Sequence, residues 1–246
     1  MSNPSSQKFD STSWQVALPG LGLRALRACL PQACALCRAG CGNTLLCAAC
    51  SAALPMLGPA CVRCALPGVE ALCAGCARRA PPWLRACAPW RYAYPVDRLL
   101  QALKYGGRLA LAEPLADGLA AVVAQRTDAL PDAIVPLPLA PSRQRTRGFD
   151  QARLIALRVG RQLRIPVLGA LSRVRDSGPQ AALPLAARAA NVRDAFAANA
   201  TLAGARIAIL DDVMTTGATL AAATHAAQRA RAAAVEVWVV ARTLPP

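Results

Sequence analysis

From about residue 96 onward, apolar positions follow two patterns that alternate along the chain. In the first, apolar residues such as Leu99, Leu100 and Leu103 recur at helical spacing, which indicates an amphipathic helix. In the second, apolar residues follow one another in short runs, which is typical of strands buried on both faces. The predicted helices are 96–104, 114–125, 150–163, 185–193 and 220–232, and the predicted extended segments are 90–94, 133–137, 167–171, 207–210 and 235–240. This alternation predicts an α/β fold, a parallel sheet with flanking helices.

The first part of the chain is instead dominated by cysteines. All eleven lie between residues 29 and 87. Eight of them form four Cys-x-x-Cys pairs: Cys34 with Cys37, Cys47 with Cys50, Cys61 with Cys64, and Cys73 with Cys76. Such a pair presents two thiolates at the spacing that tetrahedral Zn²⁺ requires. We therefore expect two zinc ribbons in series, each with four cysteine ligands and each structural, because neither ligand set leaves a position open beside an acid or base.

A disulfide framework is the alternative. The first thirteen residues are polar and show no secretion signal, so we expect a reducing, cytoplasmic setting that favours metal. Interleaved pairing of the four knuckles stays open at this point. Cys41 could replace a neighbouring ligand, whereas Cys29 and Cys87 are expected to be small packing residues. No apolar run reaches the ~18 residues that span a bilayer, so no membrane insertion is expected.

These patterns divide the chain into three parts. We expect a partly disordered N-terminal segment at 1–28, a double zinc ribbon at 29–80 and the α/β domain at 88–246, with a proline- and aromatic-rich joint at 81–95. The formal net charge of +15 falls to about +11 if eight thiolates hold two Zn²⁺ ions. This remaining basicity is compatible with a nucleic-acid partner. Aromatic residues are scarce, and four of them, Trp83, Trp90, Tyr92 and Tyr94, cluster at the joint, where core packing is the expected role, so little stacking surface is offered to bases.

The run 207–219 carries the most specific chemical signal. Four apolar residues form a short strand, and Asp211 and Asp212 follow where it ends. A loop of small and hydroxyl residues then opens into a helix, whose N-terminus offers N–H groups and a positive dipole end to an anion. Gly217 allows close approach of the backbone, and the two carboxylates can accept hydrogen bonds from a vicinal diol. The run predicts a 5-phosphoribosyl site; an ordinary strand–turn–helix would explain one aspartate and the glycine only.

A second informative stretch follows the predicted strand 133–137. Arg143, Arg145 and Arg147 stand at alternate positions before a helix for which Asp150 is the expected N-cap. Arginines beside a helix N-terminus suit a phosphate-rich ligand, although a solvated basic loop would show the same pattern. Residues 174–184 mix charged residues with Ser, Gly and Pro, a composition that suits a mobile cover over a site.

Together these segments resemble the ComF family of ComFC- and GntX-like proteins, in which a zinc module precedes a type I phosphoribosyltransferase-like domain. The run 207–219 matches the phosphoribosyl-pyrophosphate (PRPP) signature of that class at every position. The other matches, spread over residues 29–242, are Leu-Lys-Tyr-x-Gly at 103–107, Val-Pro-x-Pro at 135–138, Arg-Gly-Phe-Asn-Gln-Ala at 147–152, and the run Leu171, Arg173, Gln180, Arg188 and Asn191. Asp150 replaces the Asn of the family's box; an N-cap role survives this change, but an amide-specific contact does not.

The resemblance implies a role for each matched segment. Asp211 and Asp212 would be the catalytic pair that binds the ribose hydroxyls. The 5′-phosphate would be held by Met214, Thr215, Thr216, Gly217, Ala218 and Thr219. The pyrophosphate would be held by Lys104, Tyr105 and Gly106, with Arg143, Arg145 and Arg147 as further candidates. Residues 173–191 would form a flexible hood, and Mg²⁺ would bind with PRPP while taking few protein ligands.

Three functions fit these expectations. The chain could transfer ribose-5-phosphate from PRPP to a nitrogen nucleophile, sense PRPP without turnover, or bind single-stranded DNA as an accessory of DNA uptake or processing. The expected partners are PRPP, with single-stranded DNA, competence or helicase proteins and a second copy of the chain as further candidates. Nothing in the sequence names the acceptor. His225, the only histidine, is expected to be a helix-surface or packing residue rather than a general base.

Overall fold

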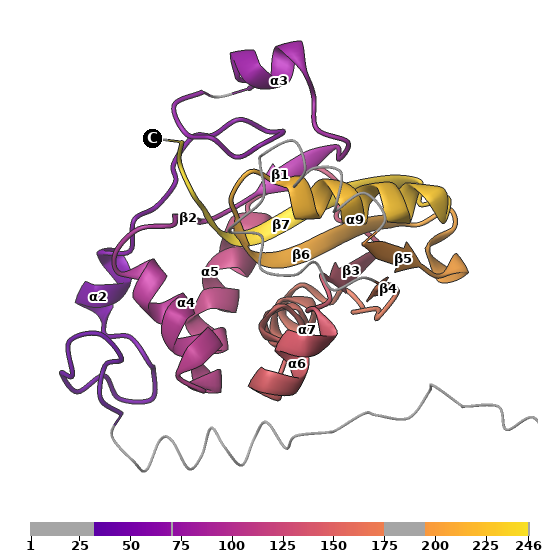
Figure 1. Ribbon diagram of the computed structural model, residues 1–246. Helices are drawn as coiled ribbons and strands as arrows, with labels where there is room; N and C mark the ends of the chain where they lie inside the picture. The colour runs from indigo at the N-terminus through magenta and orange to yellow at the C-terminus, as the bar shows by residue number, and fades with distance from the viewer. Residues whose placement is uncertain (1–31, 70, 175–194, 246) are drawn as a thin grey trace, which may run out of the picture.

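The computed structural model describes residues 32–69, 71–174 and 195–245 (Figure 1). The predicted N-terminal segment 1–28, the predicted helix 185–193, Cys29 and most of the predicted hood lie outside these residues.

The centre of the fold is a parallel sheet. Its strands are β1 (Arg85–Cys87), β2 (Trp90–Arg91), β3 (Ala133–Pro136), β6 (Arg206–Met214) and β7 (Ala234–Arg242). The order is β1-β7-β6-β3, and β2 pairs with β7 beyond the end of β1. All of these pairings are parallel, so the carboxyl ends of β3, β6 and β7 meet at one edge. A small antiparallel pair, β4 (Leu171–Arg173) and β5 (Phe196–Ala198), lies apart from the sheet.

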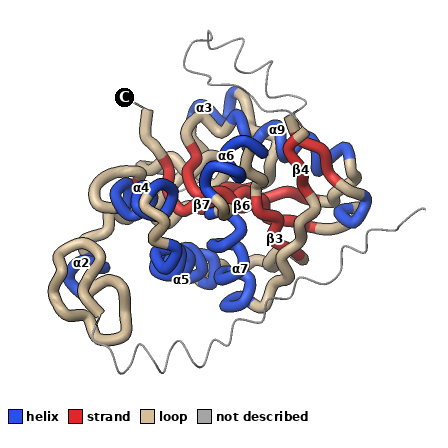
Figure 2. The backbone as a smooth tube through the Cα atoms, turned by 60° about the horizontal axis from the view of Figure 1, so that its bottom comes forward, coloured by secondary structure: helices blue, strands red, loops and turns tan. Residues whose placement is uncertain are grey.

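Helices cover both faces of this sheet. The described helices are α2 (Ala48–Ala52), α3 (Ala74–Arg78), α4 (Val96–Tyr105), α5 (Ala112–Ala124), α6 (Pro141–Arg147), α7 (Gln151–Leu163) and α9 (Ala218–Arg229), with single 3₁₀ turns η1 (Leu109–Leu111) and η3 (Ala200–Leu202). Helices α4, α5 and α7 pack on one face, with α5 and α7 side by side (Figure 2). Helix α9 packs on the other face, next to β4 and β5.

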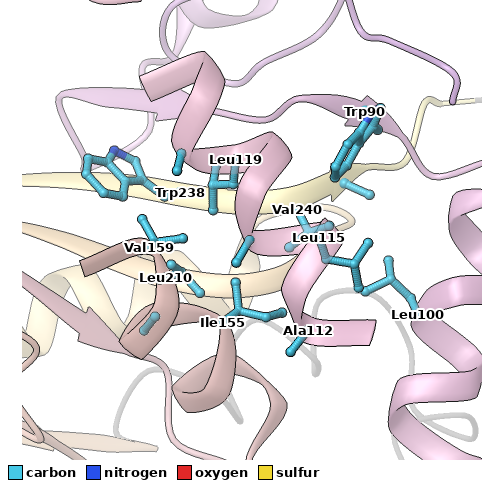
Figure 3. Packing of buried hydrophobic residues seen from close by; sticks show 14 of the residues in the cluster. Trp90, Leu100, Ala112, Leu115, Leu119, Ile155, Val159, Leu210, Trp238 and Val240 are labelled. Atoms are coloured by element: carbon cyan, nitrogen blue, oxygen red, sulfur yellow. The ribbon is translucent and has the colours of Figure 1, made fainter. Parts of the chain in front are cut away.

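The two faces are separated by the alternation of side chains along each strand. On β6, Ala208 and Leu210 join the cluster under α5 and α7, whereas Ile207 and Ile209 join the cluster under α9. Figure 3 shows the first cluster, in which Leu119 of α5 and other helix residues meet the sheet. Because the side chains that point to either face of the sheet are apolar, each strand is buried on both faces, as its unbroken apolar run indicated.

The predicted fold class, a parallel α/β sheet with flanking helices preceded by a Cys-rich module, is therefore confirmed. Several element boundaries differ. Strand β6 continues past Leu210 through both aspartates to Met214, because β7 keeps pairing with it as far as Met214 and Arg242. Helix α9 begins at Ala218, two residues earlier than predicted. The predicted aromatic strand 90–94 is shortened to Trp90–Arg91.

The arginine-rich stretch was expected as a loop and is a helix, α6. Pro141 stands in its first turn, where the missing N–H costs nothing. Gly148 ends it with φ +72°, the left-handed conformation that glycine adopts without strain. Helix α7 follows at once, and its N-cap is Asp150, whose side chain accepts a hydrogen bond from the Arg153 N–H (3.1 Å), as predicted.

The Cys-rich part docks at two separate places. Figure 1 shows α2 and its neighbouring loops beside α4, whereas α3 lies above β1 and α9. Among the described residues, no helix is both long enough and apolar enough to cross a membrane.

Candidate functional site

A cavity of about 320 Å³ opens at the carboxyl edge of the sheet. Its walls include the end of α4, the stretch from Leu137 to Gln151 with helix α6 and the first turn of α7, and the end of β6, together with Tyr92, Arg173, Thr219 and Thr243. In a parallel sheet this edge is where ligands bind, because the loops that follow the strands can vary without disturbing the core.

Asp212 is the most firmly held polar side chain of this cavity. It is buried, and its Oδ2 accepts hydrogen bonds from Lys104 Nζ at 2.8 Å and from Gln151 Nε2 at 2.9 Å. Lys104 reaches it from the last turn of α4 and Gln151 from the first turn of α7. The carboxylate is thus neutralised by a cation and fixed by an amide.

Asp211 has different surroundings. Its Oδ1 accepts a hydrogen bond from the backbone N–H of Asp212 at 2.8 Å. Burial and the neighbouring charge of Asp212 raise the pKa of Asp211 to about 7, and the Asp212 N–H and Lys104 offset only part of this rise. Asp211 therefore changes charge near neutral pH.

The predicted pyrophosphate residues are only partly brought together. Lys104, Tyr105, Arg143 and Arg147 line the cavity, and Arg147 stacks over the ring of Tyr105 with 4.8 Å between its guanidinium carbon and the ring centroid. Arg145 lies on the exposed side of α6 and does not line the cavity. The reason is helical geometry: residues 143 and 147 are one turn apart and share a face, whereas 145 does not.

Gly106 also stays outside the cavity lining, and its role is in the backbone. It is the C-cap of α4, and a Cβ atom there would lie 2.8 Å from the carbonyl oxygen of Ala102. A side chain would therefore disturb the helix end that carries Lys104.

The predicted phosphate loop, residues 214–219, faces two cavities. Thr215 and Thr219 line the first cavity. Met214, Thr216, Gly217 and Ala218 line a second cavity of about 630 Å³ on the opposite side of the loop. Gly217 has φ +79° and is the N-cap of α9, so the backbone turns there in a conformation that favours glycine.

Sequence reasoning did not name Gln151 or Arg242 as a site residue. Gln151 lies within the Arg-Gly-Phe-Asp-Gln-Ala box, directly after the predicted N-cap Asp150, and this place in the sequence could have pointed to it. Arg242 is the last residue of β7, and no local pattern marks it. His225, by contrast, is exposed on α9, with Nδ1 3.2 Å from Gln228 Oε1, as expected for a surface residue.

The eight knuckle cysteines form two groups. The groups are Cys34, Cys37, Cys47 and Cys50, and Cys61, Cys64, Cys73 and Cys76; within each, all sulfur atoms lie within 4.8 Å of one another. Consecutive knuckles thus pair, which excludes the interleaved arrangement. All ten cysteines of the described residues are free thiols, so no disulfide framework forms there. Cys41 belongs to neither group and donates to the carbonyls of Thr44 (3.0 Å) and Gln32 (3.3 Å).

The geometry of both groups fits a tetrahedral ion. Cys37 Sγ and Cys47 Sγ are 3.7 Å apart, and Cys64 Sγ and Cys73 Sγ are 3.6 Å apart. Four sulfur atoms at about 2.3 Å from Zn²⁺ are about 3.8 Å from one another. Backbone N–H groups also point at the sulfur atoms, as from Cys47 to Cys34 (3.4 Å) and from Cys73 to Cys61 (3.3 Å). The donor set and its spacing are those of a structural zinc site.

In each group, backbone amides favour the thiolate form of one buried cysteine, Cys34 in the first and Cys61 in the second. Burial raises the pKa of the Cys34 thiol, but the N–H groups of Cys37, Cys47 and Leu36 more than offset it, and the pKa falls to about 6. Cys61 behaves in the same way, and its pKa also falls to about 6.

Curated proteins similar to this chain are named for roles in DNA use. DNA utilization protein YhgH of Escherichia coli (strain K12) is 35% identical over 142 residues, which cover 54% of this chain and 63% of that protein. Competence protein F of Haemophilus influenzae is 35% identical over 100 residues, which cover 39% of this chain and 44% of that protein. The resemblance to ComF-like proteins is confirmed by these relatives, and the chain spans less than two thirds of their length. No family model matches the chain.

The solved structures that match include two that are named as phosphoribosyltransferases. Glutamine PRPP amidotransferase from B. subtilis has a TM-score of 0.39 at 20% identity and covers 56% of this chain and 30% of its own. Adenine phosphoribosyltransferase from Leishmania tarentolae has a TM-score of 0.36 at 13% identity and covers 67% of this chain and 93% of its own. Because both TM-scores are below 0.5, no property of this chain is inferred from these two structures.

Proposed function

We propose that this chain is a ComF-family, phosphoribosyltransferase-like protein that binds PRPP with Mg²⁺ and transfers its ribose-5-phosphate to an acceptor, in a pathway of DNA uptake or use. One observation carries the proposal: Asp211 and Asp212, a loop that opens a helix, and four cationic side chains converge on one cavity at the carboxyl edge of the sheet. The DNA role rests on the names of the relatives.

Each group has a task that its position suits. Asp211 and Asp212 accept hydrogen bonds from the two ribose hydroxyls. The N–H groups and hydroxyls of residues 214–219, at the N-terminus of α9, bind the 5′-phosphate. Lys104, Arg143 and Arg147 balance the pyrophosphate charge as the bond to ribose C1 breaks, so that fixed charges stabilise the leaving group. Bound Mg²⁺ would add positive charge at the pyrophosphate.

The ion pair of Lys104 and Asp212, with 2.8 Å between Nζ and Oδ2, suits an exchange of partners on PRPP binding. A pyrophosphate group offers Lys104 a stronger anionic partner and leaves Asp212 free to accept the ribose hydroxyls. Gln151 keeps Asp212 in place during this exchange through its 2.9 Å hydrogen bond.

We also propose two structural Zn²⁺ ions, one in each four-cysteine group. A thiolate set that is complete with four ligands leaves no position for substrate, so these ions would hold the fold rather than take part in the reaction.

The test is Mg²⁺-dependent PRPP binding measured by calorimetry. We expect the Asp211→Ala/Asp212→Ala double variant to lose binding, because the acceptors for the ribose diol are gone. Removing Asp212 also leaves the half-buried Lys104 without its partner, which destabilises the folded chain. Asp211→Asn, which keeps that ion pair and the side-chain shape, is therefore measured beside it and should also bind more weakly.

Asp97→Ala is the matched control, because Asp97 stands at the start of α4, away from the cavity lining. It should bind PRPP as the unsubstituted chain does. Unchanged affinity in the folded double variant would refute the site assignment.

Turnover separates the enzyme from a sensor. The zinc-loaded protein is incubated with PRPP and bases, amines, ammonia or single-stranded DNA, and released pyrophosphate is measured. Release that depends on one acceptor supports the transferase, whereas tight PRPP binding without release supports a sensor. DNA binding that survives loss of both aspartates would support a DNA-binding accessory instead.

A further inference from the structure

Arg242 joins the second four-cysteine group to the phosphate loop. The residue ends β7 and is 8% exposed. Its Nε donates to the backbone carbonyl of Cys64 at 2.9 Å. Its Nη1 donates to the carbonyls of Met214 (3.0 Å), Thr215 and Thr243 (2.7 Å). A single guanidinium thus bridges a metal-binding knuckle and the first two residues of the loop.

Trp83 makes a second connection between the same two parts. It is 3% exposed, and its Nε1 donates to the carbonyl of Arg63, which lies between the cysteines of the third knuckle, at 2.5 Å. Its ring lies so close to the loop that a Cβ atom on Gly217 would be 2.8 Å from it. Gln228 of α9 adds a hydrogen bond to the carbonyl of Pro82 at 3.0 Å.

Between these two connections, the phosphate loop is not closely packed against the second four-cysteine group. The cavity of about 630 Å³ separates the loop and α9 from the second four-cysteine group. Because close packing is absent there, the position of the loop depends on the contacts of Arg242 and Trp83.

The first four-cysteine group has no comparable link to the loop among the contacts described. Cys34, Leu46 and Leu54 belong to the apolar cluster of α4, α5 and α7, on the other face of the sheet. The two groups have the same ligands and nearly the same internal geometry, so each serves as a control for the other.

We propose that the second four-cysteine group is a positioning element for the phosphate loop, acting through Arg242 and Trp83, so that metal bound at Cys61, Cys64, Cys73 and Cys76 sets the affinity for PRPP. This inference rests on the proposed function for its ligand. A knuckle that loses its metal unfolds locally. The carbonyl of Cys64 then moves, a buried guanidinium loses an acceptor, and the loop is no longer held.

The first experiment compares Cys61→Ser with Cys34→Ser, which replace buried cysteines at equivalent positions of the two groups. Zinc content is measured by mass spectrometry, PRPP affinity by calorimetry with Mg²⁺, and amide hydrogen exchange over residues 214–219 without ligand. For Cys61→Ser we expect PRPP binding about tenfold weaker or more, which corresponds to ~1.4 kcal/mol, and faster exchange in the loop. For Cys34→Ser we expect both to stay within about twofold of the unsubstituted chain.

A second variant keeps the metal and breaks only the bridge. In Arg242→Lys the positive charge is retained, but the single ammonium group of lysine cannot donate to both the knuckle and the loop as the planar guanidinium does. We expect two zinc ions per chain, weaker PRPP binding and faster loop exchange. The control is Arg158→Lys, because the guanidinium of Arg158 also forms two ion pairs, with Asp117 and Glu113 of α5, but away from the phosphate loop. It should leave PRPP affinity unchanged.

The outcomes separate the inference from the proposed function. If the unsubstituted chain fails to bind PRPP, the proposed function fails, and the exchange of the loop still shows whether the second group positions it. If Cys61→Ser and Arg242→Lys change neither affinity nor exchange, the inference is overturned. It is also overturned if Cys34→Ser has the same effect as Cys61→Ser, because the cause is then a general loss of stability.

Discussion

Asp211 and Asp212 show how two adjacent residues of one strand acquire different chemistry. Successive side chains of a strand point to opposite sides. Asp212 therefore meets Lys104 and Gln151, while Asp211 is half-buried and forms no ion pair with any of the described residues. The two aspartates are identical and adjacent in the sequence, but the residues that surround their side chains differ.

This difference predicts a dependence on pH. The pKa of Asp211 is raised to about 7, so the folded chain keeps a proton that the unfolded chain loses at about pH 4. The free energy of unfolding should therefore fall as the pH rises through this range and become constant above about 7. PRPP affinity should change in the opposite sense and rise towards about pH 8, since the ionised carboxylate accepts the ribose hydroxyls.

Urea unfolding and calorimetry across this range measure both effects. Asp211→Asn removes the titrating group and should flatten the pH dependence of stability. The phosphates of PRPP titrate equally with either protein, so the difference between the two affinity profiles isolates Asp211. Identical profiles would contradict the assignment.

At the scale of elements, the site is built where helix ends meet strand ends. Helix α4 delivers Lys104 from its last turn, α7 delivers Gln151 from its first, and β6 presents the aspartates between them. These positions depend on how closely the helices pack on the sheet and on the joint that precedes α4.

A substitution of Gly118 in α5 tests how closely this helix packs on the sheet. A Cβ atom there would lie 2.1 Å from Cη2 of Trp90, a buried residue of β2. Alanine favours a helix interior by about 1 kcal/mol over glycine, but overpacking costs about 1–3 kcal/mol. We expect Gly118→Ala to lower the free energy of unfolding, measured by urea denaturation.

The matched control is Gly169→Ala, where a Cβ atom would meet nothing within 4 Å. It should leave the free energy of unfolding nearly unchanged. A more stable Gly118→Ala protein would mean that Trp90 can move aside without loss.

At the scale of the whole molecule, two four-cysteine groups support an α/β core from opposite faces. The first group shares the cluster of α4, α5 and α7, and the second adjoins the segment that packs with α9. The core has its own apolar interior on each face of the sheet, and β3, β6 and β7 pair with one another without residues of either group.

We therefore expect two zinc ions per chain and a graded response to their removal. A strong chelator should abolish protection from hydrogen exchange in residues 34–50 and 61–76, because small metal sites fold only with their metal. The amides of β6 and β7 should stay protected. Mass spectrometry gives the stoichiometry and exchange gives the location; one ion per chain, or unchanged exchange after chelation, would contradict this expectation.

Local spacing along the chain was enough to predict the parallel α/β class, the Cys-x-x-Cys knuckles and the acidic pair before the small loop. Apolar runs, two thiolates per knuckle and consecutive residues of one strand are all local patterns. Local spacing could not show that β6 runs on to Met214, since that end is set by pairing with β7. It could not separate Arg143 and Arg147 from Arg145 until α6 was known to be a helix. Tertiary structure alone brought Lys104 and Gln151 to Asp212 and placed Arg242 between Cys64 and Met214, because contacts between distant residues depend on how whole elements pack.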